Sequence, residues 1–405
     1  MKKTILISIG NFFYEPTASI RNSGFSNSAA SRKNKSLLQA VSHALNSTSA
    51  ILSFSRPPLS KSTKSYYPAS ALELAKSLIY ISAPYFKSRY ISLAASILFM
   101  IRVLCRYYKR GQSQLQLILL YYNPNITHWP LIIASRILGY HNVLQLEDLP
   151  TGHSLHHTLM RLALRSFYGP RFFKAWLVTS PGFTKYAHSN IPVYCYYGVI
   201  NALPKIKTLD IFYSIDSARQ VLRFLFSGTL DTDSGALLLY KSLLLLQDIY
   251  NNSRILIEFH ITGSGSLERL FHDLNSTNSL ISFIYHGCLL ESDFNHLLSQ
   301  SHFGLSLKLR SGLYGDTTFP SKLFTYLNHS LVPISTRLPQ VLECFGNSII
   351  YTDENPDSVA ETIVEATRHS SYSFHHAKLS HAYDKHNMSK CGQDLSCFLI
   401  KQCLN

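Results

Sequence analysis

The second half of this chain repeats one pattern, in which short apolar runs alternate with amphipathic segments. Apolar runs such as "RFLFS", "ILIEFHIT" and "LVPIST" have the length of a strand and end in small or polar residues. Segments with apolar residues at helical spacing, such as "GALLLYKSLLLLQDIY", separate them. Continuous apolar strands joined by helices are typical of a parallel sheet that is covered on both faces. We count six such strands after residue 220.

The first half follows the same pattern less regularly. Residues 4–9 predict a strand, and the polar stretch that follows, up to residue 75, predicts mostly loop. From residue 115, "LQLILLYYNP", "HWPLIIASRILGY" and "NVLQLEDLP" predict strand, helix and strand, and "FKAWLVTSPGF" predicts a further strand and loop. The fold class is therefore α/β, with two Rossmann-like doubly wound domains, at residues 1–200 and 201–405, joined within residues 197–210. Ligands of such folds bind at the carboxyl ends of the strands, and we expect the two domains to face a central cleft.

The positive charge of the chain is concentrated in the first predicted domain. The whole chain carries +15. Residues 1–200 contain 22 Lys and Arg against 4 Asp and Glu, which gives +18, whereas residues 201–405 carry −3. This split favours an anionic partner for the first domain: an acidic lipid surface, a phosphorylated acceptor or a nucleic acid. The sequence contains no known nucleic-acid-binding motif, so we expect no nucleic-acid partner.

A helix with a basic face follows the longest uncharged stretch, which runs over residues 90–101. Its 12 residues are fewer than the roughly 18–20 that a membrane-spanning helix needs. Arg102, Arg106, Lys109 and Arg110 then share one helical face. Two interpretations remain open: a helix lying on an anionic membrane, or a core helix with a solvated basic end. For the first, we expect a cytoplasmic peripheral protein at the inner face of the cell membrane.

The sequence does not predict a metal site or a disulfide framework. The seven Cys residues lack C-x-x-C spacing and are typical of free thiols in a reducing compartment. His153 and His157 would share a helical face, but Ser154 stands where a zinc peptidase has its Glu, and no third ligand is evident. We therefore expect no required metal or other cofactor.

Small residues follow three strands of the second domain. Gly228, Gly263 and Gly287 each come directly after, or one residue after, an apolar run, where a missing side chain lets a ligand approach the backbone. A fourth segment, "GDTTFPSKLFTYLNHSLVPIST", combines a loop, a short helix that begins near Pro320, and a strand. It places Lys322 in the first turn of that helix, where an anion is stabilised. No P-loop and no strict G-x-G-x-x-G occurs.

These segments, in this order and spacing, resemble the retaining GT-B glycosyltransferases of the group 1, bacterial polysaccharide type. The similar segments are "SGTLDTDSG", "ITGSGSLERL", "YHGCLLESDFNHLLSQSHFGLSL" and "FPSKLFTYLNHSLVPIST", and they cover about residues 220–370. "YYNPN", "LQLEDLP" and "VTSPGF" match more loosely in the first half. The resemblance implies transfer of a hexose from a nucleotide-sugar co-substrate to a glycan or lipid-linked acceptor in cell-surface polysaccharide synthesis.

The resemblance also implies a donor site. The diphosphate would lie at the start of the helix that contains Lys322, the base would rest on residues 287–289, and the sugar would contact residues 315–319. A cation beside the diphosphate offsets the charge of the leaving group, so Lys322 is a candidate catalytic residue. The predicted donor-binding residues are Gly228, Thr229, Gly263, Gly287, Leu289, Lys308, Arg310, Thr317, Thr318, Ser321, Lys322 and Thr325.

The sequence departs from the family at charged positions. The family's basic pair falls on Thr229 and Ser234, and its two Glu residues fall on Thr317 and Thr325. Lys308 and Arg310 are candidates to replace the lost positive charge. The loss of a carboxylate–hydroxyl bond of roughly 1.5–3 kcal/mol at Thr325 should weaken ribose binding tenfold or more. The alternative is therefore a catalytically degenerate GT-B protein that acts as a binding or scaffold partner.

Two carboxylates of the first domain are further candidates. Glu147 and Asp148 follow a predicted strand, where they would orient an acceptor hydroxyl as catalytic residues. The alternative is a capping pair at a strand–loop junction. His128 begins a helix, and we expect it to be an ordinary surface residue.

Overall fold

In a computed structural model of the chain, the described residues are 3–10, 29–54, 65–111, 115–147, 168–208, 210–213, 218–252, 254–311, 315–368 and 371–403. The chain forms two compact units. The first comprises Met1–Val199, Thr317–Phe319 and Met388–Asn405, and the second comprises Ile200–Asp316 and Pro320–Asn387. The sequence analysis placed all of residues 201–405 in the second domain; the structure instead groups the last helix and residues 317–319 with the first unit.

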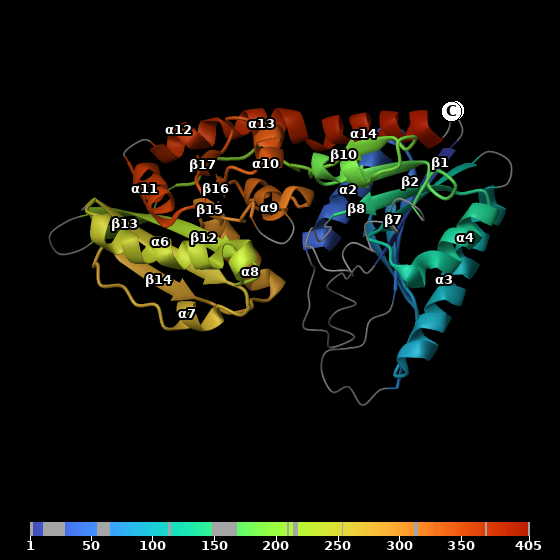
Figure 1. The fold of residues 1–405 in the computed structure, drawn as a ribbon, viewed down its shortest axis with the longest axis horizontal. Coiled ribbons are helices and arrows are strands. Elements are labelled where there is room, and N and C mark those ends of the chain that lie inside the picture. Colours follow the sequence, from blue (N-terminus) through green and yellow to red (C-terminus); the bar gives the residue numbers. More distant parts are fainter. Residues whose placement is uncertain are drawn as a thin grey trace. The chain divides into compact units, whose positions relative to one another are not determined.

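A sheet of eight described strands forms the centre of the first unit (Figure 1). Its order is β10-β9-β8-β7-β1-β2-β5-β4, and all neighbours are parallel except β4 and β5. The strand order reverses between β1 and β7, which is the position where doubly wound sheets bind ligands. The strands are β1 (Lys3–Gly10), β2 (Thr48–Ser53), β4 (Ser70–Ala75), β5 (Leu78–Ser82), β7 (Leu115–Tyr122), β8 (His141–Leu146), β9 (Ala175–Val178) and β10 (Val193–Cys195). A separate hairpin pairs β3 (Tyr66–Tyr67) with β6 (Tyr85–Phe86).

Helices cover both faces of this sheet. Side chains of β1 alternate between two buried clusters: Ile7 packs with residues of α3 (Arg89–Gly111) and α4 (Trp129–Ile137), whereas Leu6 packs with residues of α2 (Ala29–Leu45) and α14 (Met388–Cys403). The strand period of two thus sends successive apolar residues into opposite cores, as a sheet that is buried on both faces requires. Two short 3-10 helices, η1 (Ile126–His128) and η2 (Pro181–Tyr186), complete the described elements.

The second unit has the six parallel strands that the sequence predicted, in the order β14-β13-β12-β15-β16-β17 (Figure 1). A seventh described strand, β11, pairs antiparallel with β12. The order reverses between β12 and β15. The strands are β11 (Asp210–Tyr213), β12 (Ala218–Ser227), β13 (Ile255–Thr262), β14 (Ile281–Tyr285), β15 (Phe303–Ser306), β16 (Val332–Thr336) and β17 (Ile350–Thr352).

Helices alternate with these strands along the chain. Tyr326 of α9 and Leu297 of α8 join one buried cluster with Leu225 of β12, and α6 lies against α11. The helices are η3 (Thr232–Ser234), α6 (Ala236–Ile249), α7 (Glu268–His272), α8 (Glu291–Gln300), η4 (Gly315–Thr317), α9 (Lys322–Asn328), α10 (Pro339–Phe345), α11 (Pro356–Ala366), α12 (Ser371–Ala377) and α13 (Leu379–His386).

Two predictions about secondary structure were wrong. The stretch before residue 75 contains α2, β2 and β4 where we expected mostly loop. The inner face of α2 mixes the buried apolar residues Leu37, Leu38 and Val41 with the buried polar residues Asn34 and Ser42, which interrupt its apolar pattern in the sequence. The His-rich segment near the C-terminus, for which the sequence alone indicates an ordinary exposed segment, forms α12 and α13. His386 is buried there because its ring packs on Phe324 and Phe345.

Candidate functional site

Three glycine loops are stacked at the carboxyl ends of β12, β13 and β14. The N–H of Gly228 donates to Thr262 O (3.0 Å), and the N–H of Gly263 donates to Gly287 O (2.8 Å). Gly263 has φ +131°, and a Cβ built on it would lie 1.8 Å from the carbonyl oxygen of Gly228. This glycine is therefore required by the neighbouring loop, which is a different reason from the ligand approach that the sequence suggested.

Lys322, the first residue of α9, extends over the first of these loops. A Cβ built on Gly228 would lie 3.1 Å from Lys322 Nζ, so the glycine leaves room for the ammonium group. The same Nζ lies 4.6 Å from the centre of the Phe226 ring. The side chain keeps some solvent access, but protein atoms surround its charged end, and this burial lowers the pKa of Lys322 to about 7.

A second cation lies near Lys322. The positive charge of Lys308, which follows β15, is the smaller cause of the lowered pKa of Lys322. No ion pair joins Lys322 to a carboxylate among the described residues. An anion at this position would therefore relieve both the desolvation of Lys322 and its repulsion from Lys308. Lys322 and Lys308 thus place two cationic side chains at the switch between β12 and β15, and an anion site there stays a prediction.

Thr229 and Ser234, where the glycosyltransferases that the sequence resembles carry a basic pair, belong to the same loop. The Ser234 hydroxyl donates to the carbonyl oxygens of Thr229 and Asp231. Asp231 in turn accepts from the N–H and the hydroxyl of Ser266, which holds the pKa of its carboxyl low. These bonds fix the loop after β12, which is a structural role for Ser234 without charge.

The remaining predicted donor residues have different surroundings. Thr325 lies one helical turn after Lys322, and Ser321 is the residue before α9. Leu289 packs against the cluster around Leu225, so part of its surface serves the core. Thr317 and Thr318 are buried and belong to the first unit.

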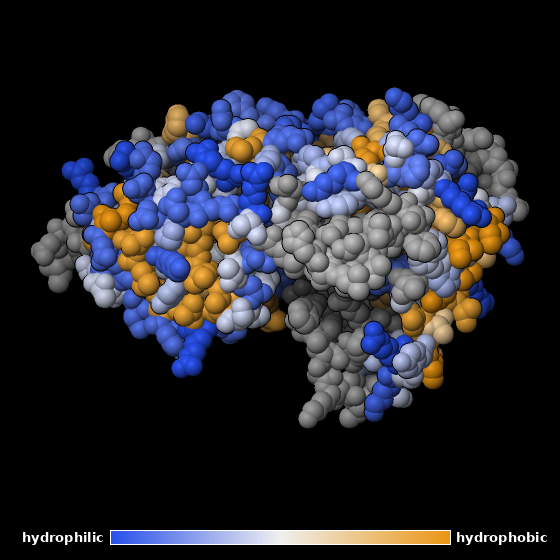
Figure 2. Space-filling model, in the orientation of Figure 1, coloured by the Kyte–Doolittle hydropathy of each residue, from blue (hydrophilic) through white to orange (hydrophobic). Residues whose placement is uncertain are grey.

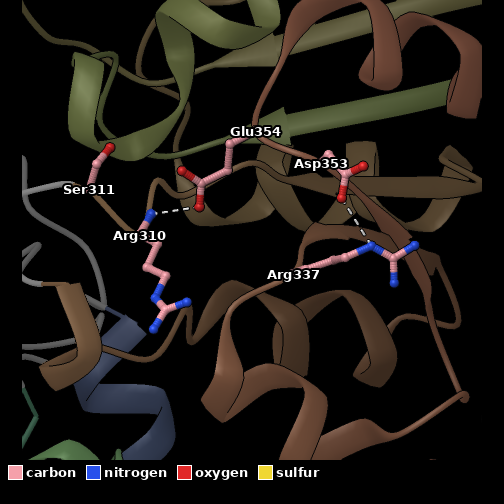
Figure 3. Close-up of a pocket in the computed structure, with 5 residues that line it drawn as sticks. All are labelled: Arg310, Ser311, Arg337, Asp353 and Glu354. Atoms are coloured by element: carbon pink, nitrogen blue, oxygen red, sulfur yellow. Dashed lines mark hydrogen bonds and ion pairs between the residues drawn. The ribbon is translucent and has the colours of Figure 1, made fainter.

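Arg310 lines a separate pocket of about 560 Å³ beside the ends of β15, β16 and β17 (Figure 3). Its backbone N–H donates to Glu354 Oε1 (2.7 Å), and its side chain extends away from that carboxylate. Arg337 Nε donates to Asp353 Oδ1 (3.1 Å). Two arginines and two carboxylates balance in charge, so the pocket suits the hydroxyls of a sugar better than a bare diphosphate.

The first unit has its own polar cluster at the carboxyl end of β8. Glu147 is 9% exposed, and its Oε2 accepts from Lys33 Nζ at 2.8 Å. Gln145 Nε2 lies 3.4 Å from the other carboxylate oxygen, and Lys33 Nζ lies 5.6 Å from the centre of the Tyr196 ring. Asn123 accepts from the Glu147 N–H (2.9 Å). Glu147 is thus a carboxylate that is paired with Lys33 at a strand end.

Two buried polar atoms of this cluster have no hydrogen-bond partner in the part of the chain that the structure describes. They are Gln145 Oε1 and Tyr196 OH. Buried polar atoms usually have partners, so these two are exceptions. Lys33, Gln145 and Tyr196 were not predicted from the sequence. Lys33 was overlooked because it lies in the stretch that we took for a loop.

Two further candidates of the first unit have different outcomes. Asp148 lies outside the described residues. His128, which we expected on the surface, is 1% exposed, and its ring packs edge-on against Phe54. Burial lowers the pKa of His128 to about 4, so this residue is neutral and belongs to the core.

Comparison with solved structures finds trehalose-6-phosphate synthases over the whole chain. A trehalose-6-phosphate synthase, OtsA, has a TM-score of 0.63 and 10% identity, covering 98% of this chain and 99% of that chain. An E. coli structure bound with UDP-2-fluoro glucose has a TM-score of 0.61 and 9% identity, covering 99% of both chains. A UDP-forming α,α-trehalose-phosphate synthase from Burkholderia xenovorans in complex with glucose-6-phosphate has a TM-score of 0.61 and 11% identity, covering 97% and 99%.

These likenesses confirm the predicted fold class. The chain has the GT-B fold, built from two Rossmann-like α/β domains. No family model matches the sequence, and a comparison with curated proteins finds no match. At about one identical residue in ten, structural likeness establishes the fold, and activity has to be argued from the sites of this chain.

Proposed function

We propose that this protein is a glycosyltransferase that moves a sugar from a nucleotide-sugar donor to a hydroxyl of an acceptor. One observation carries the proposal: Lys322, with a pKa lowered to about 7 and without a described carboxylate partner, lies over Gly228 at the switch point of a GT-B donor sheet. A nucleoside diphosphate is the ligand whose charge fits this position.

In the proposed reaction, the bond between the sugar C1 and the diphosphate oxygen breaks, and a bond from C1 to the acceptor oxygen forms. Lys322 and Lys308 stabilise the negative charge that grows on the departing diphosphate, and the acceptor proton leaves with that group. One similar trehalose-6-phosphate synthase is described as transferring with retention, and we propose the same stereochemical outcome here. The residues in these roles require no metal ion.

We propose the first unit as the acceptor side, with Glu147 as a positioning group. Because Glu147 is held by Lys33, it accepts a hydrogen bond from an acceptor hydroxyl more readily than it removes a proton. The acceptor that we propose is a glycan or lipid-linked sugar of cell-surface polysaccharide synthesis. A soluble sugar phosphate, of the kind bound in the Burkholderia xenovorans synthase, is the alternative acceptor.

The first test is binding of UDP, GDP and ADP to the purified full chain by calorimetry. We expect one saturable nucleotide, with affinity that falls 10- to 100-fold in Lys322→Ala, as the loss of a charge-assisted bond predicts. Lys241→Ala, at an exposed position of α6, is the matched control. Equal binding by both variants would contradict the assignment of Lys322.

Turnover separates the enzyme from a catalytically degenerate binding or scaffold protein. The nucleotide that binds is supplied as its sugar conjugate, with glucose 6-phosphate or with a lipid extract as acceptor, and release of the nucleoside diphosphate is followed. Binding without release in either case would favour the scaffold alternative. NMR of the product's anomeric proton reports whether configuration is retained.

A further inference from the structure

One outer surface of the first unit combines exposed apolar and basic side chains on α3. The exposed residues of α3 recur at helical spacing and form a stripe that is apolar at its start and basic at its end. Tyr90 and Leu98 are 84% and 68% exposed, which is far more than side chains of this kind usually show. The residues of this α3 stripe are Tyr90, Ile91, Leu98, Arg102, Arg106 and Lys109.

Helix α4 extends the same surface. Ile133 and Ile137 are 46% and 80% exposed, Arg136 lies beside them, and α4 packs against α3. Figure 2 shows the resulting apolar area over α3 and α4 at the right of the view. A contiguous exposed apolar surface rimmed by basic groups marks an interaction site.

The opposite side of α3 is part of the core. Met100, Val103 and Leu104 pack in the buried cluster on that face of the sheet. By length and composition alone, residues 89–109 of α3 could cross a membrane, and only 28% of their most apolar 18-residue stretch is buried in the protein. Because its inner side is needed by the sheet, α3 is placed to lie along a membrane surface while the domain stays folded.

A small pocket opens next to the stripe. It has a volume of about 310 Å³, lies between β4 and α3, and is lined mainly by apolar groups that include Ile81, Phe99 and Val103. Arg106 belongs both to this pocket and to the stripe. An apolar hollow beside an exposed guanidinium suits a molecule with an anionic head and a hydrocarbon part.

We propose that the surface formed by the α3 stripe and α4 binds an anionic lipid bilayer, with α3 lying in the plane of the interface. Tyr90, Leu98 and Ile137 enter the headgroup boundary, while Arg102, Arg106 and Lys109 contact lipid phosphates. The excess of +18 in residues 1–200 attracts the same kind of surface over a longer range. This assignment is independent of sugar transfer, because vesicle binding requires neither donor nor acceptor.

The test is flotation of the full chain with phosphatidylcholine vesicles that contain or lack phosphatidylglycerol. Each basic residue near an anionic surface contributes roughly a factor of five in affinity, so R102Q/R106Q/K109Q should bind on the order of 100-fold more weakly. The matched control, K241Q/R254Q/R269Q, changes the net charge equally at exposed positions of the second unit. It should bind like the unchanged chain.

The apolar half of the surface is tested by L98Q/I137Q. We expect this variant to bind weakly, whereas L203Q/I206Q, at exposed positions of the second unit, should bind normally. Circular dichroism checks that each variant is folded. Equal flotation of surface and control variants would overturn the proposal. If membrane-bound protein resists alkaline extraction, α3 spans the membrane, and the proposal is overturned. If the chain does not bind vesicles but forms an oligomer that the L98Q/I137Q substitutions dissociate, the surface is an interface between copies, and the proposal is also overturned.

Discussion

Replacement of Lys322 by methionine should stabilise the second unit while it weakens diphosphate binding. The pKa of Lys322 is about 7 in the folded chain, against 10.5 for an ordinary lysine. Between these values the unfolded chain holds a proton that the folded chain lacks, so the contribution of Lys322 to stability rises with pH. Below about pH 7 both states are protonated, and the folded state carries the full cost of the desolvated charge.

The size of the effect follows from the pKa difference. The shift from 10.5 to about 7 corresponds to a ceiling of about 5 kcal/mol. Residual solvent access at Lys322 lowers the expected gain to roughly 2–4 kcal/mol below pH 7. Methionine keeps most of the apolar stem that packs near Phe226 and removes the charge. The advantage of Lys322→Met should shrink by about half between pH 6 and pH 9.

Urea unfolding at these two pH values measures the gain, and the chain supplies an internal reference. Its two tryptophans, Trp129 and Trp176, both belong to the first unit, so tryptophan emission reports that unit, whereas far-UV circular dichroism reports both. Lys322→Met should move the dichroism transition to higher urea, and Lys241→Met should move neither signal. A less stable Lys322→Met, or a gain that does not depend on pH, would refute the reasoning.

Three further predictions concern other residues. Diphosphate affinity should fall as pH rises above 7, by up to about tenfold per unit, because a bound anion favours protonated Lys322; calorimetry in Lys322→Met should lose this slope. Gly263→Ala should lower the free energy of unfolding by about 3 kcal/mol or more, because the added Cβ would meet Gly228 O. Gly139→Ala has open space around the added Cβ and should lower it by about 1 kcal/mol; urea unfolding measures both. Glu147→Gln should lower the free energy of unfolding by about 3 kcal/mol, because it leaves the buried Lys33 without its ion pair. If the ion pair is the cause, the double variant K33M/E147L should lower it less, as measured by urea unfolding.

The sequence was sufficient for the fold where strands are buried on both faces. In β12, Phe224, Leu225 and Phe226 are successive apolar residues that are all fully buried, and the order of such runs along the chain indicates a doubly wound sheet. It was not sufficient for α2, whose buried face carries Asn34 and Ser42. The same face also carries the buried apolar residues Leu37, Leu38 and Val41, so its apolar spacing is interrupted by polar residues and is harder to recognise in the sequence.

The candidate site could be predicted only in part, for a related reason. The position of Lys322 could be predicted because a helix start after a strand is a local feature. Lys33 and Glu147 are 114 positions apart in the sequence, and their 2.8 Å contact exists because α2 and the end of β8 meet in the folded unit. Gly263 was identified as a candidate, but the sequence did not show that the atom excluding a side chain there belongs to Gly228, 35 positions earlier.

The charge state of Lys322 connects the departures from the family pattern with the structure. Thr229 and Ser234 supply no charge, and Ser234 instead closes the loop after β12. Had two further cations stood there, the folded chain without ligand would have to hold them close to Lys322 and Lys308, at an additional electrostatic cost. Because this chain has fewer cations there, the pKa of Lys322 is about 7, and about half of its side chains are neutral at that pH. A bound diphosphate supplies a negative charge and thereby favours the protonated form of Lys322. Thr229→Arg, which restores one cation, should therefore strengthen diphosphate binding and lower the stability of the ligand-free chain. If the variant changes only the affinity or only the stability, position 229 does not face the anion.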